Sequence, residues 1–299
     1  MTATGFDAAV AAPRVATSME EPPRRARRGA PGAVGRRIIL AVAAIYFIGP
    51  LIAAISFTLK GPNGGLSLSA YRQIFTANAT GQVNFSTAIV YSLEIAVVTI
   101  LLTLALLLPT QLLLHLRFPR VRGLVEVITL LPLVFPPIVL VVGVNDAYAN
   151  IHGGALGSVL LYIRDANHPL LLAFLYVMLA MPFVFRTLDA GIRSIDARVL
   201  VEAARNLGAG WPAVLVRVLL PCLRTAVVNS AFLCFALVMG EFTIAQILTY
   251  SKPFPVWLYQ LPTTSGHVQV AVSVFSLALV ELLLLIIGAL NWRSVRKEG

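Results

Sequence analysis

Charged residues are scarce in this chain. Only 12% of its 299 residues are Asp, Glu, Lys or Arg, and 58% are hydrophobic, whereas a soluble domain carries about a quarter charged residues. So little polar surface cannot coat a water-soluble globule. The apolar residues fall into long runs without the periods of amphipathic helices or half-buried strands, which is typical of helices that face lipid. The composition therefore predicts an all-α integral membrane protein.

Cysteine is rare, and nucleotide-binding and catalytic motifs are missing. The two cysteines, Cys222 and Cys234, lie in one apolar run, and on a helix they are about 18 Å apart. This is too far for a disulfide, and no metal-binding pattern surrounds them. No segment reads Gly, four residues, Gly-Lys-Ser/Thr, so the chain has no phosphate-binding loop of its own. No catalytic group can be assembled from spacing, which predicts a non-catalytic chain without a bound cofactor or metal.

Long apolar stretches dominate what remains. Six of them can cross a bilayer of about 30 Å, which takes about 20 residues; they are residues 34–59, 86–116, 123–145, 168–188, 222–249 and 267–291. Several contain prolines, which bend a helix because they remove a backbone donor. We expect residues 1–33 to be a disordered basic tail, 34–85 a first helix with an outer loop, 86–291 the main transmembrane domain and 292–299 a short cytoplasmic tail.

The basic residues predict the orientation. The net charge is +10, and all but four of the 23 Lys and Arg residues lie in segments that share one side of the membrane; the four on the other side are Lys60, Arg72, Arg164 and Lys252. Such an excess marks the cytoplasmic side, so both termini are predicted to be cytoplasmic. Because these residues lie between apolar runs, they do not indicate binding to nucleic acid. The basic charge of the N-terminal tail is expected to hold it against anionic lipid.

The cytoplasmic segment between the fourth and fifth spans predicts a short amphipathic helix. Asp196 suits its N-cap and Gly208 a left-handed C-terminal stop. Between them an apolar stripe with i, i+3, i+4, i+7 spacing is formed by Leu200, Ala203, Ala204 and Leu207. Polar contacts beside the stripe come from Glu202, Arg205 and Asn206. We expect this surface to dock another protein.

The same segment carries a spaced signature: Glu-Ala-Ala, three residues, Gly, nine residues, an aliphatic residue, one residue, then Leu-Pro. It is filled by Glu202, Ala203, Ala204, Gly208, Val218, Leu220 and Pro221. The chain thereby resembles the permease subunits of binding-protein-dependent ABC importers, over residues 86–291. The resemblance implies a coupling helix from Asp196 to Gly208, closed by Pro221 at the fifth span.

The resemblance also implies the partners and the location. The partners would be an ATPase dimer that holds ATP and Mg²⁺, a second permease subunit that is a paralogue, and an extracytoplasmic solute-binding protein. The location would be a bacterial cytoplasmic (inner) membrane, which the chain crosses several times.

Polar residues inside the spans indicate a pathway. Glu94 and Glu241 lie at a similar depth, about 12 Å from the outer surface, and Thr87, Tyr91 and Glu94 share one helix face. Two carboxylates and an aromatic ring suit a cation, and the overall pattern resembles spermidine/putrescine permeases. Each Glu could instead be protonated or hydrogen-bonded to a neighbouring helix, and the Gly240-Glu241-Phe242 tripeptide is similar to one in permeases thought to carry anions.

Other functions stay open at this point. The same importer class could carry another small solute, such as an anion, a metal ion, an aminophosphonate or thiamine. A secondary transporter would need repeated halves, and no convincing repeat relates the first three spans to the last three. A membrane-embedded enzyme would need clustered catalytic groups at one depth, for which Glu94 and Glu241 are the one candidate pair.

Overall fold

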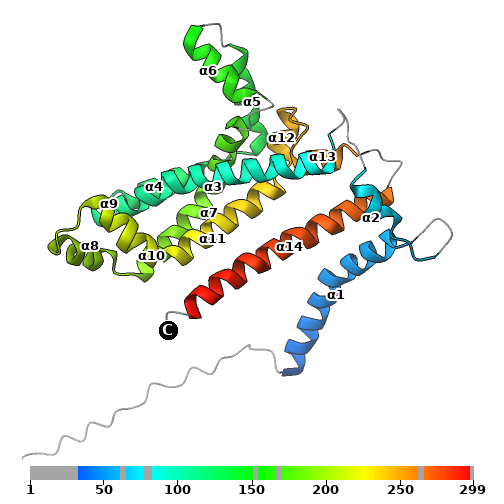
Figure 1. Ribbon diagram of the computed structural model, residues 1–299, viewed down its shortest axis with the longest axis horizontal. Helices are drawn as coiled ribbons and strands as arrows, with labels where there is room; N and C mark the ends of the chain where they lie inside the picture. The colour runs from blue at the N-terminus through cyan, green and yellow to red at the C-terminus, as the bar shows by residue number, and fades with distance from the viewer. Residues whose placement is uncertain are drawn as a thin grey trace, which may run out of the picture. The chain divides into compact units, whose positions relative to one another are not determined.

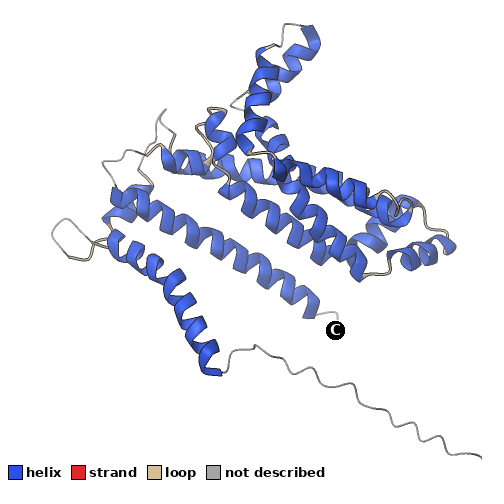
Figure 2. Cartoon of the chain, turned by 180° about the vertical axis from the view of Figure 1, so that it is seen from behind, coloured by secondary structure: helices blue, strands red, loops and turns tan. Residues whose placement is uncertain are grey.

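The computed structural model describes residues 33–60, 65–76, 83–150, 154–165, 170–261 and 266–296. This part of the chain is helical and has no strand; Lys60 and Leu66 form an isolated antiparallel bridge (Figure 2). The chain divides into two units, residues 1–50 and 51–299. The first helix, α1 (Ala33–Thr58), begins in the first unit and ends in the second. The predicted basic tail lies almost entirely outside the described residues.

Three long helices form the centre of the second unit. They are α3 (Phe85–Leu116), α7 (Leu170–Ser194) and α11 (Arg224–Gly240), and they pack against one another along their lengths (Figure 1). The Asn84 side chain begins α3 by accepting the Thr87 amide at 2.9 Å. Large apolar side chains fill the space between them, including Ile95, Leu107, Tyr176 and Phe185. The second and fourth predicted spans are confirmed as continuous helices.

The third and fifth predicted spans are not single helices. The third is α4 (Arg122–Val134) followed by α5 (Pro137–Ala149), with a bend of 89° between them. Pro136 and Pro137 cause the break, because neither can donate the amide that a continuing helix needs. The bend that the prolines predict is therefore present, and it is sharp enough to divide the third span into two helices.

The fifth predicted span is broken twice. The segment that leads into it consists of α9 (Trp211–Ala213), a π-helix η1 (Val214–Leu219) and α10 (Leu220–Cys222). After α10 the chain bends by 75° into α11. Helix α11 ends at Gly240, Glu241 is extended, and α12 (Thr243–Ile247) follows. Residues 222–249 thus do not form the one predicted helix.

By length and composition, three helices within the described residues can cross a membrane: α1, α3 and α7. The number rises to five if each bent pair is one span. The sixth predicted span corresponds to α14 (Gly266–Arg296), which continues past residue 291, where the sequence placed a short tail. The structure thus supports a multi-pass membrane protein, while the count of six stays a prediction.

Shorter helices gather at the two ends of the α3–α7–α11 bundle. At one end, α8 (Ala197–Asn206), α9 and η1 cover the last turns of α3 and α7 (Figure 1); we call this the α8 end. At the other, α2 (Ser69–Ile74) and α13 (Phe254–Tyr259) cover the start of α3, with α14 beside them; we call this the α13 end. The remaining helix is α6 (Gly154–Arg164).

Candidate functional site

Helix α8 begins and ends at the residues that the sequence predicts. The Asp196 Oδ1 accepts the Val199 amide at 3.4 Å, which caps the first turn. At the other end Gly208 has φ +83°, a left-handed conformation that strains any residue with a Cβ. The amides of Gly208 and Ala209 donate to the carbonyls of Arg205 and Ala204 and so close the last turn.

The predicted apolar stripe of α8 does not lie on one surface. Ala204 packs inward with Ala197 and Val201, and Leu200 lies partly against the same cluster. Ala203 is exposed, and Leu207 is 89% exposed. The expectation of a single docking stripe is therefore wrong: the chain uses a second apolar register, Ala197, Val201 and Ala204, to hold α8 against its own core.

The outward face of α8 combines polar and apolar groups. Its exposed residues are Arg198, Val199, Glu202, Ala203, Arg205 and Asn206, and Leu207 follows directly after the helix. The Arg205 guanidinium lies over the Trp211 ring, 5.3 Å from its centroid. An exposed face with a carboxylate, two guanidinium groups and a protruding leucine can make both charged and apolar contacts with another protein.

Pro221 lies where the α8 segment joins the bundle. It sits within α10, directly after the π-helical turn and before the 75° bend into α11. A proline has no amide to donate to the preceding turn, and π-helical turns are often found at functional sites. The signature therefore ends at a bent joint, which connects the outward face of α8 to a central helix.

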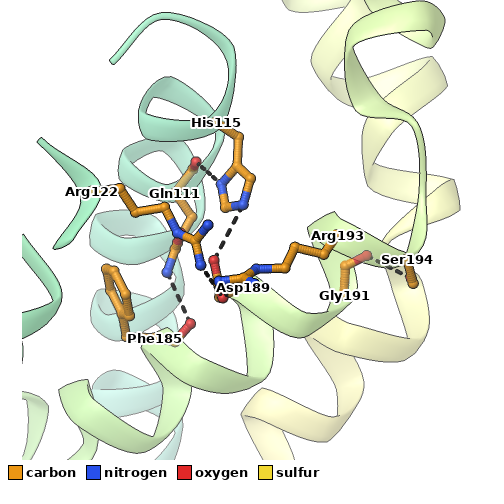
Figure 3. Close-up of polar contacts among 8 residues, drawn as sticks. All are labelled: Gln111, His115, Arg122, Phe185, Asp189, Gly191, Arg193 and Ser194. Atoms are coloured by element: carbon orange, nitrogen blue, oxygen red, sulfur yellow. Dashed lines mark hydrogen bonds and ion pairs between the residues drawn. The ribbon is translucent and has the colours of Figure 1, made fainter. Parts of the chain in front are cut away.

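A cluster around Asp189 ties the central helices together just before α8 (Figure 3). The Asp189 carboxylate of α7 lies 2.7 Å from the Arg122 guanidinium of α4 and 3.0 Å from that of Arg193. His115 of α3 approaches it at 3.2 Å through Nε2, while its Nδ1 lies 2.9 Å from the Gln111 carbonyl. The two ring nitrogens thus face one oxygen of α7 and one of α3, and the ring lies between the two helices.

Sequence reasoning missed this cluster. Asp189 and Arg193 share a helix face at i, i+4, which is a visible signal for an ion pair. The contact with Arg122 joins residues 67 positions apart, and spacing in the sequence does not reveal such a pair. A further long-range bond from Gln111 Nε2 to the Phe185 carbonyl, at 2.9 Å, holds α3 to α7 nearby.

A pocket of about 310 Å³ opens near the α13 end of α3. It is lined by Ser86, Thr87, Val90, Tyr91, Glu94 and Lys252. The structure therefore brings together three of the predicted pathway residues, Thr87, Tyr91 and Glu94. It adds a cation that the sequence analysis had not placed there: the Lys252 ammonium lies 5.5 Å from the centroid of the Tyr91 ring.

Glu241 is not among the residues that line this pocket. Its carboxylate accepts the Ile244 amide at 2.7 Å, and so begins α12 after the break in the fifth span. The expected pair of carboxylates around a cation is therefore replaced by one carboxylate, Glu94, and one ammonium group, Lys252. The alternative in which Glu241 is hydrogen-bonded locally fits the geometry better.

A second cavity, of about 570 Å³, lies between α7 and α11 toward the α8 end. Its polar lining comes from Arg186, Thr187, Ser194, Thr225 and Asn229. Leu223 and four small residues line the rest. One of these, Gly191, lies so close to Ala226 that a Cβ on the glycine would overlap the alanine Cβ. Within the described ranges, no group of three or more His, Cys, Asp or Glu residues is placed to hold a metal ion.

The structure combines a bundle of bent membrane helices with a short capped helix that precedes a bend at Pro221. This combination is expected of a membrane subunit that is moved by a partner protein. The chain belongs to the family of binding-protein-dependent transport system inner membrane components, whose model matches residues 112–297. It is thus an importer permease subunit, a non-catalytic multi-pass membrane component that works with an ATPase and a binding protein.

Relatives narrow the class further. Over 261 residues, 83% of this chain and 91% of the relative, it is 28% identical to the molybdenum transport system permease protein ModB of Mycobacterium tuberculosis. It is also 30% identical to the ModB protein of Azotobacter vinelandii, over 56% of this chain and 74% of that protein. These names do not support the predicted resemblance to spermidine and putrescine permeases. They favour the alternative, an importer of another small solute.

Proposed function

We propose that this permease conducts a molybdenum oxyanion and is driven by an ATPase that docks on α8. The observation that carries the cargo proposal is the pair of cations in its two cavities, Lys252 near the α13 end and Arg186 toward the α8 end. In neutral water hexavalent molybdenum is a tetrahedral dianion. Cationic groups in a cavity raise the local concentration of such an anion, and the names of the relatives point to the same element.

The pocket near the α13 end contains both a positive and a negative side chain, which suits transient binding of the anion better than tight binding. Lys252 attracts an oxyanion, and Glu94 in the same pocket opposes tight binding. A conducting site has to bind its cargo well enough to admit it and weakly enough to release it. In the α7–α11 cavity, hydroxyl and amide groups from Thr187, Thr225 and Asn229 can donate hydrogen bonds to oxyanion oxygens.

Energy would reach the pathway through α8. The exposed Glu202, Arg205 and Leu207 offer the contacts with one subunit of an ATPase dimer that carries ATP and Mg²⁺. Movement of α8 would be transmitted through η1 and Pro221 to α11, which lines the cavity of about 570 Å³ between α7 and α11. A second permease subunit, a paralogue, would supply the other docking helix, and an extracytoplasmic binding protein would deliver the anion at the α13 end. The excess of Arg in the α8 segment favours the cytoplasmic side for the α8 end.

The cargo is tested in proteoliposomes that contain the full transporter with its ATPase and binding protein. We expect ATP-dependent uptake of molybdate, no competition by spermidine, and a loss of uptake in Lys252→Gln and Arg186→Gln. The control is Lys60→Gln, which removes an exposed lysine that lines neither pocket. Uptake of spermidine without uptake of molybdate would overturn the cargo proposal.

The coupling surface is tested separately in the same proteoliposomes. Glu202→Lys and Gly208→Asp should abolish transport while the protein remains inserted and ATP is still hydrolysed. Asp146→Lys, which makes the same charge reversal at an exposed position of α5, should transport normally. Normal transport by both α8 variants would show that the ATPase docks elsewhere.

A further inference from the structure

An apolar groove lies at the α8 end and is not part of either cavity described above. It has a volume of about 540 Å³ and lies between the last turns of α3 and the helices α9 and η1. Its walls are Pro109, Leu112, Leu113, Leu116, Trp211, Pro212, Leu215, Val216 and Leu219, and its one charged lining residue is Arg117. No part of the proposed transport function uses this groove.

The groove changes from apolar to cationic along its length. From Pro109 to Arg117, α3 rises by about 12 Å, and Arg117 follows directly after the last residue of this apolar helix. Trp211 lines the same groove and has the Arg205 guanidinium over its ring. Tryptophan is enriched at the boundary between lipid and water, so the groove runs from membrane depth to the surface.

Two guanidinium groups stand at this boundary. Arg117 is exposed and has no carboxylate partner among the described residues, and Arg205 lies at the other wall through its stack on Trp211. The occupant that matches this arrangement has a long apolar part and one anionic head. Basic pockets between membrane helices on the cytoplasmic side bind anionic lipid head groups in this manner.

We propose that this groove is a binding site for an anionic phospholipid, with an acyl chain along Leu112, Leu116 and Leu215 and the phosphate at Arg117. Arg205 contributes to the same head group from α8. The lipid would therefore touch Trp211 of α9 and, through it, Arg205 of α8. A membrane rich in anionic lipid would then hold α8 in place for its partner.

Quenching of Trp211 fluorescence tests the site in the full chain. The protein is reconstituted with bilayers that contain brominated phosphatidylglycerol or brominated phosphatidylcholine at equal fractions. The Trp211 signal is the difference from the variant Trp211→Phe, which keeps an aromatic ring; Trp257 and Trp292 are present in both proteins and cancel in this difference. We expect stronger quenching by the anionic lipid, and about fivefold weaker preference in Arg117→Gln, because one arginine near the surface contributes about that factor.

The matched control is Arg120→Gln, which removes the same charge three residues further along the exposed loop and outside the groove. It should keep the preference. Equal quenching by both lipids would mean that only ordinary boundary lipid enters, and quenching by neither would mean that a protein covers the groove; each result overturns the proposal. This measurement does not depend on molybdate transport. Its result therefore tests the lipid site independently of the cargo proposal.

A count of bound lipid gives an independent readout. Native mass spectrometry of the permease purified from mixed bilayers should detect a retained phosphatidylglycerol, which Arg117→Gln loses and Arg120→Gln retains. Retention in both variants would assign the lipid to another surface and would overturn the assignment to Arg117.

Discussion

The α13 end and the α8 end of the bundle are stabilised by different chemistry. At the α13 end, aromatic rings pack edge to face, including Phe85 against Phe75, Trp257 and Phe275. Side chains there also bond the backbone: Trp257 Nε1 donates to the Val83 carbonyl at 2.7 Å, and the Ser92 hydroxyl accepts the Phe254 amide at 2.7 Å. At the α8 end, the central contact is instead a carboxylate shared by two arginines and a histidine.

The two chemistries respond differently to displacement. Close packing resists small shifts because a gap of even a fraction of an ångström loses dispersion contacts. An ion pair can exchange partners, and Asp189 has His115, Arg122 and Arg193 within reach. The α13 end is thus built as a fixed support, and the α8 end as an adjustable joint beside the helix that we propose to receive the ATPase.

The largest effect is expected from Trp257, the largest side chain that the described core buries completely. Trp257→Ala leaves a cavity and an unpartnered Val83 carbonyl, and should lower the free energy of unfolding by about 3–5 kcal/mol. Unfolding in mixed detergent and SDS micelles measures this change. Trp257→Phe keeps most of the volume and should cost about 1–2 kcal/mol for the lost hydrogen bond. A loss below about 1 kcal/mol in the alanine variant would contradict the fixed-support description.

Asp189→Asn tests the adjustable joint. The amide has the shape of the carboxylate but not its charge, so Arg122 loses its ion pair in a site where the Asp189 side chain is only 14% exposed. We expect a loss of about 2–3 kcal/mol in the same assay, below the value for a fully buried pair because Arg193 is largely solvated. Asp146→Asn, at an exposed position, should change nothing. Identical unfolding of both variants would show that the Asp189 cluster does not stabilise the α8 end.

Gly191→Ala probes the close approach of α7 and α11 at the α8 end. The added methyl overlaps the Ala226 side chain, and overpacking of this kind costs about 1–2 kcal/mol unless the helices separate. Gly143→Ala is the matched control, because nothing lies within 4 Å of a Cβ on that glycine, and in a helix alanine is the better residue. Equal stability of the two variants would mean that α7 and α11 can move apart freely.

Local signals in the sequence were enough for part of this structure. The long apolar runs predicted α3 and α7, and Asp196 and Gly208 predicted both ends of α8, because a cap and a left-handed stop depend on neighbouring residues alone. Hydropathy did not predict the broken spans. Pro136 and Pro137 are visible in the sequence, but an apolar run has the same hydropathy whether its helix continues or turns by 89°.

The candidate site was less predictable, because it depends on contacts between distant segments. The helical spacing of Thr87, Tyr91 and Glu94 placed them on one face correctly. The same reasoning could not add Lys252, which reaches them from the segment after α12. The sequence of α8 allows two sets of apolar residues to face the core. Packing against Leu112 and Leu219, which the sequence of α8 alone does not reveal, turns Ala204 inward.

The smallest predicted effect concerns the cap that begins α8. The bond from the Val199 amide to Asp196 is long, at 3.4 Å, so Asp196→Ala should cost about 0.5 kcal/mol, the lower limit for a lost N-cap. Global unfolding would hardly register this change, whereas hydrogen exchange at the Val199 amide should quicken about twofold, the factor to which that free energy corresponds. Asp196→Asn keeps a capping oxygen and should exchange like the unchanged protein. If exchange quickens equally in both variants, the charge of Asp196 and not its capping oxygen holds the first turn, and α8 is then secured electrostatically like the rest of its end.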